Sequence, residues 1–180
     1  MIGRLVGASL ALVLLATASP GAEPDFAALQ VQRYDPPKPA PTFALPDLNE
    51  QSVRLVDLRG KVVLLYFWAT WCPDCQKELP SVSKLYTDLR SRGLEVLLIN
   101  FREDPGLVKR TVEERGYLAP VLLDQSGEVT GKQYGVWGPP TAYFVDRRGQ
   151  LVGRVVGPRP WGSPAARQFI LALLEAPERR

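Results

Sequence analysis

The chain has 180 residues, of which 46% are hydrophobic, so it is long enough for one domain with a sizeable core and too short for two. Its net charge of +3 comes from 22 basic and 19 acidic residues that are interspersed along the chain, and this pattern gives no indication of nucleic-acid binding. The absence of histidine excludes the commonest metal ligand, the commonest general base and any Cys-His nucleophile pair. The chemistry must therefore use thiols, carboxylates or the backbone.

The first residues are typical of a secretory signal peptide. Arg4 precedes an apolar run of 14 residues that ends at Ala18 with the small residues ATA. A membrane span needs about 20 apolar residues, so we expect residues 1–18 to be a cleaved signal rather than a retained anchor. Cleavage after Ala18 or after Ala22 fits the pattern. The mature protein is then expected outside the cytoplasm, in the periplasm or its equivalent, where a thiol pair can be oxidised.

Residues 19–40 are rich in proline, alanine and charged side chains and contain the sequence YDPPKPA. Such a segment is poor in periodic apolar residues, and we expect it to be an extended linker. Two short alternating stretches, TFALPDL and SVRLVDL, follow on either side of Asn49-Glu50 and predict a small β-hairpin. We expect the folded domain to cover residues 41–177.

The central part of the chain predicts a strand, a helix and another strand. The apolar run VVLLYFW, residues 62 to 68, is typical of a strand that is buried on both faces. Apolar residues at helical spacing then predict a helix over residues 74 to 92, with Gly93 as its C-cap. The sequence LEVLLIN, residues 94 to 100, predicts the next buried strand.

The remaining elements follow in regular order. Asp104 and Pro105 predict the start of a helix that extends to Gly116. The stretches PVLLD, TAYFV and QLVGRVV predict three strands, with a brief helix that ends at Gly135 between the first two. A last amphipathic helix is predicted from Ser163 onward.

This order of elements predicts an α/β fold with a central mixed β-sheet flanked by helices on both faces and an added N-terminal β-hairpin. In such sheets the functional residues lie beyond the carboxyl ends of the strands. The two cysteines of the chain, Cys72 and Cys75, fall at such a place, between a buried strand and the start of a helix.

The CxxC spacing allows several roles for the two cysteines. A purely stabilising disulfide is disfavoured, because the loop it would close contains only two residues. Zinc usually needs four ligands, and haem attachment needs a histidine where Gln76 stands. Copper(I) is harder to exclude, because soft sulfur ligands suit it. Two roles therefore remain for Cys72 and Cys75, a redox pair and a copper(I) site.

The expected position of the cysteines favours redox chemistry. The positive end of a helix dipole and its free N–H groups stabilise a thiolate, and Cys72 is expected at that end. Pro73 suits the first helical turn, because it has no N–H to satisfy. Cys75, one turn later, is placed to resolve a mixed disulfide. Asp74 opposes a thiolate while suiting the first turn of a helix, so the residues alone leave the reduction potential open.

The sequence WCPDC after a buried strand resembles the redox motif of the thioredoxin-like fold. Three longer stretches, PTFALPDL, LRGKVVLLYFWATWCPDCQKELP and YGVWGPPTAYFVDRRG, resemble the TlpA/ResA/DsbE group of envelope thiol-disulfide oxidoreductases. The resemblance covers residues 41–157 and implies a thioredoxin-like fold with dithiol-disulfide exchange at Cys72 and Cys75 and no other cofactor. It also implies a reductant of disulfides in envelope proteins, with apocytochrome c or a copper-site assembly factor as target and a membrane thiol carrier as electron donor.

The resemblance also gives Glu78 a role. In thioredoxins a buried acid on the strand before the motif handles the proton of the second thiol, but Tyr66 stands at that position here. Proteins similar to this chain have a glutamate at the position of Glu78, which lies three residues after Cys75 on the same helix face. We therefore expect Glu78 to accept the Cys75 proton. The alternative is a solvated surface glutamate.

Four further residues match positions around the redox motif of the family. Trp68 and Trp71 correspond to aromatic residues that screen the cysteines and shape the partner surface, although core packing is the alternative for Trp68. Pro140 corresponds to the cis-proline opposite the cysteines, with an ordinary trans turn as the alternative. Pro139 departs from the family pattern, because it has no N–H to offer to a partner strand. We expect a weaker or differently registered peptide contact there.

Two other functions are compatible with the sequence. The first is a copper(I)-binding chaperone with Cys72 and Cys75 as metal ligands, although the chain has no histidine as a third ligand and Met1 leaves with the signal. The second is a thioredoxin-like interaction module whose CxxC pair is idle.

Overall fold

The computed structural model describes residues 23–177. The predicted signal peptide, with its proposed cleavage positions after Ala18 and Ala22, lies outside the described residues. Within residues 23–177, no helix is both long and apolar enough to cross a membrane.

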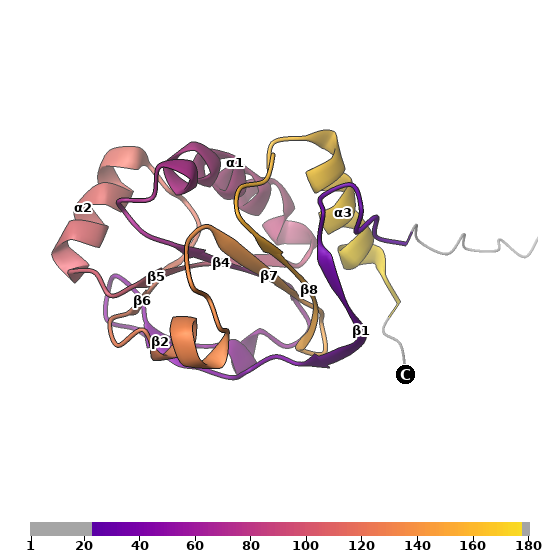
Figure 1. Cartoon of the computed structure of the whole chain (residues 1–180), viewed down its shortest axis with the longest axis horizontal. Helices are drawn as coiled ribbons and strands as arrows, with labels where there is room; N and C mark the ends of the chain where they lie inside the picture. The colour runs from indigo at the N-terminus through magenta and orange to yellow at the C-terminus, as the bar shows by residue number, and fades with distance from the viewer. Residues whose placement is uncertain (1–22, 178–180) are drawn as a thin grey trace, which may run out of the picture.

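The centre of the molecule is a six-stranded sheet with the strand order β1-β8-β7-β4-β5-β6 (Figure 1). Strands β4, β5 and β6 are parallel to one another, and β7, β8 and β1 continue the sheet in antiparallel pairs. This arrangement confirms the predicted mixed sheet. Its strands are β1 (Gln32–Pro39), β4 (Val62–Trp68), β5 (Leu94–Phe101), β6 (Val121–Asp124), β7 (Thr141–Val145) and β8 (Gln150–Val156).

Three α-helices cover one face of the sheet (Figure 1). They are α1 (Pro73–Leu89), α2 (Pro105–Arg115) and α3 (Pro164–Glu175). The opposite face packs against the small antiparallel sheet of β2 (Ala44–Pro46) and β3 (Ser52–Arg54) and against two short helical segments, the 3-10 helix η1 (Leu55–Leu58) and the π-helix η3 (Glu128–Gln133). A further 3-10 turn, η2 (Arg90–Arg92), follows α1 and ends at Gly93.

Strand β4 lies in the middle of this packing, and all seven of its side chains are buried. Tyr66 and Trp68 belong to the core under the α-helices, whereas Phe67 belongs to the core on the opposite face. The alternation follows from the two-residue period of a strand, and a continuous apolar sequence is what two covered faces require.

The prediction of a linker over residues 19–40 is wrong for residues 32–39, which form β1 at the edge of the sheet beside β8. Proline is tolerated in an edge strand because the strand has one unpaired side, and the side chains of β1 are mostly exposed, so no apolar period marks it. Gly153 in β8 lies opposite Arg33, and a Cβ atom there would come within 2.6 Å of Val31. This glycine lets β1 approach, and the domain begins before residue 41.

The sheet brings four chain segments together at one end. Trp68 at the end of β4 is in register with Asn100 near the end of β5, and Thr141 at the start of β7 is in register with Phe67 and with Val156 at the end of β8. The loops that follow β4, β5 and β8 and the loop that precedes β7 therefore meet at the carboxyl end of β4, which is where the cysteines follow.

Candidate active site

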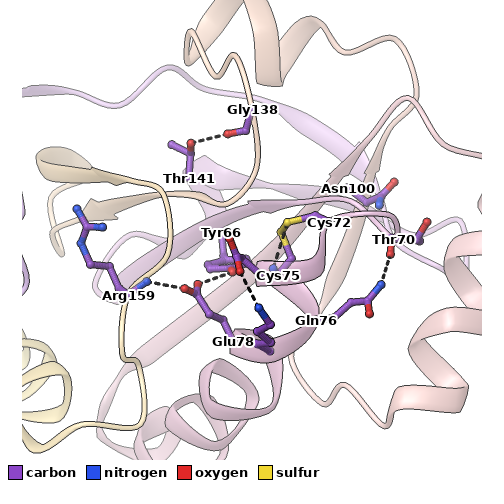
Figure 2. Close-up of a disulfide and its surroundings, with 12 residues drawn as sticks. Tyr66, Thr70, Cys72, Cys75, Gln76, Glu78, Asn100, Gly138, Thr141 and Arg159 are labelled. Carbon is purple, nitrogen blue, oxygen red and sulfur yellow. Dashed lines mark hydrogen bonds and ion pairs between the residues drawn. A yellow bond between two sulfur atoms is a disulfide. The ribbon is translucent and has the colours of Figure 1, made fainter.

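Cys72 and Cys75 form a disulfide in the first turn of α1 (Figure 2). Cys72 is the N-cap residue, with an extended backbone, and its sulfur accepts a hydrogen bond from the backbone N–H of Cys75 at 3.1 Å. Pro73 occupies the first helical position, where its missing N–H costs nothing. The helix terminus therefore directs a backbone N–H at the Cys72 sulfur, which also stabilises the thiolate formed on reduction.

The two cysteines differ in their access to solvent. Cys72 retains 3% of its surface and Cys75 none. A partner thiol or disulfide can therefore reach the pair only through Cys72, which supports the division into an attacking and a resolving cysteine.

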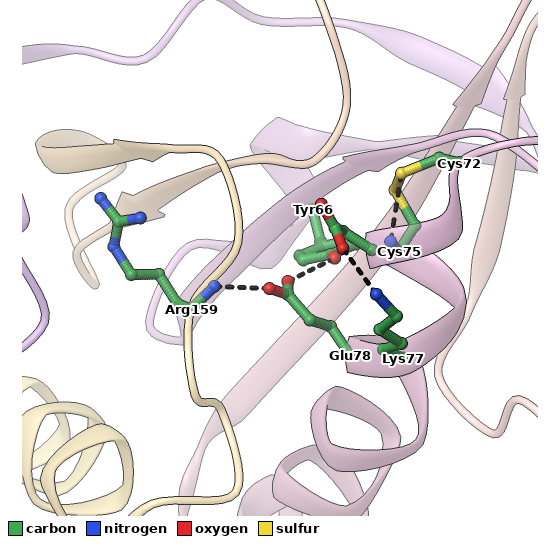
Figure 3. A network of polar contacts seen from close by, with 7 residues as sticks. Tyr66, Cys72, Cys75, Lys77, Glu78 and Arg159 are labelled. Carbon is green, nitrogen blue, oxygen red and sulfur yellow. Dashed lines mark hydrogen bonds and ion pairs between the residues drawn. A yellow bond between two sulfur atoms is a disulfide. The ribbon is translucent and has the colours of Figure 1, made fainter.

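Glu78 is buried one helical turn after Cys75, with 8% of its surface exposed, and is not a solvated surface residue. Its Oε2 accepts hydrogen bonds from the Tyr66 hydroxyl at 2.7 Å and from the Trp161 indole N–H at 2.9 Å. Its Oε1 accepts a hydrogen bond from the backbone N–H of Arg159 (Figure 3). A carboxylate has about four lone-pair sites, so these donors leave room for a further proton donor.

Burial is the largest influence on the Glu78 carboxyl and raises its pKa, because the charged form loses water. The hydrogen bonds from Tyr66, Arg159 and Trp161 oppose this shift, and the charge of Asp74 adds slightly to it, so that the net direction is upward. Burial together with the neighbouring Glu78 also raises the pKa of Tyr66, which stays a neutral donor. A carboxylate whose pKa is raised is a stronger proton acceptor for a thiol than an ordinary carboxylate.

Asp74 lies at the surface between the cysteines, where its carboxylate pairs with Lys77 at 3.2 Å. Both side chains are well exposed, so water screens this pair and its contribution to stability is small. The positive charge of Lys77 offsets part of the negative charge of Asp74 near Cys72.

The two tryptophans around the motif have different environments. Trp68 is fully buried and packs edge to face on Tyr117, with ring centroids 5.7 Å apart, so it is a core residue and does not form part of a partner surface. Trp71 is 63% exposed and immediately precedes Cys72. Only Trp71 of these two is therefore available to a partner.

The loop before β7 contains Pro139 and Pro140, and the peptide bond between them is cis. The Pro140 carbonyl accepts a hydrogen bond from the Gly157 N–H at 2.9 Å, and the Gly138 carbonyl accepts one from the Thr141 hydroxyl at 2.9 Å (Figure 2). These carbonyls are therefore already paired within the protein. Pro139 has no N–H, so the loop offers a partner strand fewer backbone groups than a loop with another residue at this position.

The structure adds a polar network that the sequence analysis did not find. Thr70, in the loop between β4 and α1, bonds to Glu103 and Gln76, and Glu103 also bonds to Asn100. Trp161 and Arg159, which hold Glu78, were likewise missed. These contacts join residues that are far apart in the chain. The one signal in the sequence that points to them is that a buried carboxylate needs hydrogen-bond donors.

No group of three or more histidine, cysteine, aspartate or glutamate side chains within residues 23–177 is arranged to hold a metal ion. The two sulfurs, joined in a disulfide, are the reactive atoms of the site.

Comparison with known proteins gives consistent results. The family model described as AhpC/TSA matches residues 36–154. Thiol-disulfide oxidoreductase ResA of Bacillus anthracis is 37% identical over 120 residues, which is 67% of this chain and 69% of that protein. ResA of Geobacillus thermodenitrificans is 36% identical over 118 residues, which is 66% of this chain and 67% of that protein. The crystal structure of a DsbE-type thiol:disulfide interchange protein from Chlorobium tepidum superposes with a TM-score of 0.71 at 34% identity, covering 77% of this chain and 96% of that one.

A thioredoxin-like sheet with a CxxC disulfide at the start of the helix after a central strand defines a thiol-disulfide oxidoreductase. This protein is a thiol-disulfide oxidoreductase of the ResA/DsbE type. The chain belongs to the AhpC/TSA family.

Replacement of Glu78 by glutamine tests the carboxylate as a proton acceptor. In the native protein, release of a mixed disulfide on Cys72 should accelerate as the pH rises through the raised pKa of Glu78, because only the ionised carboxylate accepts the Cys75 proton. Glu78→Gln should slow release by about 100-fold near neutral pH and move its pH dependence to the alkaline range of the thiol itself. Stopped-flow measurement of probe release over pH 5–10 checks this.

Glu113→Gln is a matched control, because Glu113 is exposed on α2. Its pH profile should coincide with that of the native protein. A Glu78→Gln profile that also coincides would show that Glu78 does not accept the proton.

Replacement of Pro139 by valine should strengthen the contact with an extended partner peptide, because it adds an N–H donor. One such hydrogen bond contributes about 0.5–1.5 kcal/mol, so we expect peptide affinity and mixed-disulfide lifetime to rise by about two- to tenfold. Peptide affinity is measurable in a Cys75→Ser background, and mixed-disulfide lifetime in the protein that retains Cys75. Pro37→Val, on the exposed β1, is the control, and equal values for the two variants would refute the role of Pro139.

Proposed function

We propose that this protein is an extracytoplasmic reductant of disulfides in envelope proteins, with Cys72 as nucleophile, Cys75 as resolving cysteine and Glu78 as proton acceptor. The observation that carries the proposal is the arrangement of these three residues on α1. The Cys72 sulfur caps the helix and is the accessible one, Cys75 lies behind it, and a buried carboxylate follows one turn later.

The reaction begins with the dithiol form. The Cys72 thiolate attacks one sulfur of a partner disulfide, forms a mixed disulfide and releases the other partner sulfur as a thiolate. Glu78 accepts the Cys75 proton, directly or through water, and the resulting Cys75 thiolate attacks the Cys72 sulfur. The Cys72–Cys75 disulfide forms, the second partner thiolate leaves, and the partner has gained two electrons. A thiol donor must then reduce Cys72–Cys75 for the next cycle.

The charges around the motif support a reductant. Strongly oxidising members of the fold stabilise the thiolate of their reduced form, which makes the disulfide easy to reduce. Here, the side chains that surround the motif include the carboxylates of Asp74 and Glu78. Negative charge near Cys72 opposes the thiolate and favours the disulfide, so that the protein tends to give electrons to its partner.

The cellular setting of the proposal is supported by the first 22 residues and by the resemblance to envelope oxidoreductases. A signal of this kind delivers the domain to a compartment where disulfides form and persist. We propose apocytochrome c or a copper-site assembly factor as the target and a membrane thiol carrier as the electron donor.

Equilibration with glutathione buffers tests the proposed direction of electron flow. The reduction potential should lie near that of thioredoxin, about −270 mV, and far below that of the oxidant DsbA, about −120 mV. Cys75→Ser should accumulate a mixed disulfide with the partner, and Cys72→Ser should form none. A potential near that of DsbA would refute the reductant, whereas slow exchange together with tight copper(I) binding would favour the copper chaperone.

Trp137 is expected to contribute to partner binding. It lies three residues before Pro140 and is 98% exposed, which is unusual for so large an apolar side chain. Trp137→Ala should lower kcat/KM for a protein disulfide by about tenfold, because exposed tryptophans often dominate protein interfaces. Exchange with glutathione disulfide should be unchanged, since that molecule is too small to use the surface.

Leu118→Ala is the control for this variant, because Leu118 is another exposed apolar residue and lies in the loop between α2 and β6. It should leave both rates unchanged. Equal rates for Trp137→Ala and Leu118→Ala with the protein disulfide would exclude Trp137 from the partner surface.

A further inference from the structure

We propose that Glu103 is a positioning residue for the redox pair, and that it acts by holding the loop between β4 and α1 through Thr70. This loop, residues 69–72, carries Cys72 at its end. The inference rests on the thiol-disulfide exchange at Cys72 described above and adds a residue that has no place in that reaction sequence.

The Glu103 carboxylate binds the loop with both oxygens. Its Oε2 accepts the backbone N–H of Thr70 at 2.8 Å and the side-chain amide of Asn100 at 2.6 Å, and its Oε1 accepts the Thr70 hydroxyl at 2.5 Å. Hydrogen bonds to a charged acceptor are stronger than those between neutral groups. Two of the three donors belong to one residue, so the contact fixes the orientation of Thr70 as well as its position.

Thr70 has a second side-chain partner. Its carbonyl accepts a hydrogen bond from the Gln76 side chain at 2.7 Å, and Gln76 in turn accepts one from Arg115 at 3.2 Å (Figure 2). Every polar group of Thr70 therefore has a side-chain partner. This loop has no sheet or helix ladder, so these side chains, together with the hydrogen bond from the Cys72 N–H to the Ala69 carbonyl at 3.2 Å, define the path of the chain into Cys72.

The backbone on the Glu103 side is adapted to this contact. Arg102, the residue before Glu103, has a left-handed conformation with φ of 58°, which is uncommon for residues other than glycine. Its N–H bonds to the carbonyl of Asp124 at 3.1 Å, and its side chain bonds to the carbonyl of Ser126. An unfavourable conformation persists only where the surroundings determine it, and here it turns the chain after β5 back toward the redox loop.

We call the contact between Glu103 and Thr70 the clamp, and its effect is largest in the dithiol form. In the oxidised protein the disulfide itself restrains Cys72, but after reduction the hydrogen bonds of the loop and of the helix cap remain. A loop that is held in place keeps the Cys72 and Cys75 sulfurs close to each other and raises their effective concentration in ring closure. The clamp should therefore accelerate resolution and favour the disulfide form at equilibrium.

The Glu103→Gln substitution separates the geometry of this contact from its charge. The glutamine oxygen can accept from the Thr70 N–H and from Asn100, and the glutamine amide can donate to the Thr70 hydroxyl, which has free lone pairs. Glu103→Gln thus retains all three hydrogen bonds without the charge, whereas Glu103→Ala loses all three. At Thr70, the serine variant keeps the hydroxyl and the valine variant removes it at nearly the same volume.

The test measures resolution of a glutathione mixed disulfide on Cys72 and the equilibrium constant with glutathione, at pH 7 and with native protein as reference. Glu103→Ala should slow resolution at least tenfold and lower the equilibrium constant for disulfide formation by about threefold or more. Glu103→Gln should remain within twofold of native protein in both. Thr70→Val should slow resolution by about two- to fivefold and Thr70→Ser should not, which keeps the test valid if Glu103→Ala does not fold.

Glu113→Ala, on the exposed side of α2, is the matched control. The inference is overturned if Glu103→Ala and Thr70→Val both stay within twofold of this control. It is also overturned if Glu103→Gln loses as much as Glu103→Ala, because the charge and not the position would then be responsible. Failure of the native protein to exchange at all would instead contradict the proposed function.

Discussion

The geometry of the site depends on the start of α1 directly after β4. Because β4 is buried on both faces, its end cannot shift without disturbing two cores, and Pro73 begins the helix five residues later. The N-cap position then gives Cys72 a backbone N–H donor and places Cys75 one turn inside, without solvent contact. Reactivity at one sulfur and protection of the other are thus two consequences of a single strand-to-helix junction.

The buried Glu78 carboxylate needs hydrogen-bond donors, because an ionised carboxylate away from water is unfavourable without them. They come from β4 through Tyr66 and from the loop after β8 through the Arg159 N–H and the Trp161 indole. The Arg159 guanidinium in turn donates to the carbonyl of Leu29 at 2.7 Å. The segment before β1, which the sequence analysis assigned to a linker, is thereby connected to the residue that holds the acid.

Features with a local signal in the sequence were predictable, and features made by contacts between distant segments were not. The run VVLLYFW identified β4, Asp104 and Ser163 were correctly predicted as the starts of α2 and α3, and the CxxC spacing identified the site. Strand β1 was missed because its exposed, proline-rich sequence has no period, and its place is determined by β8. The environments of Glu78 and Glu103 depend on loops more than 30 residues away, for which the chain has no local pattern.

The position of the acid separates this site from that of the thioredoxins it resembles. In thioredoxins the acid lies on the strand before the motif, whereas here Tyr66 occupies the strand position and donates its hydroxyl to a glutamate on the helix itself. An acid and a thiol on one helix keep their relative position through the helical repeat, because residues three apart lie on the same face. The strand then needs to supply only a neutral donor, which a fully buried position tolerates far better than a second charge.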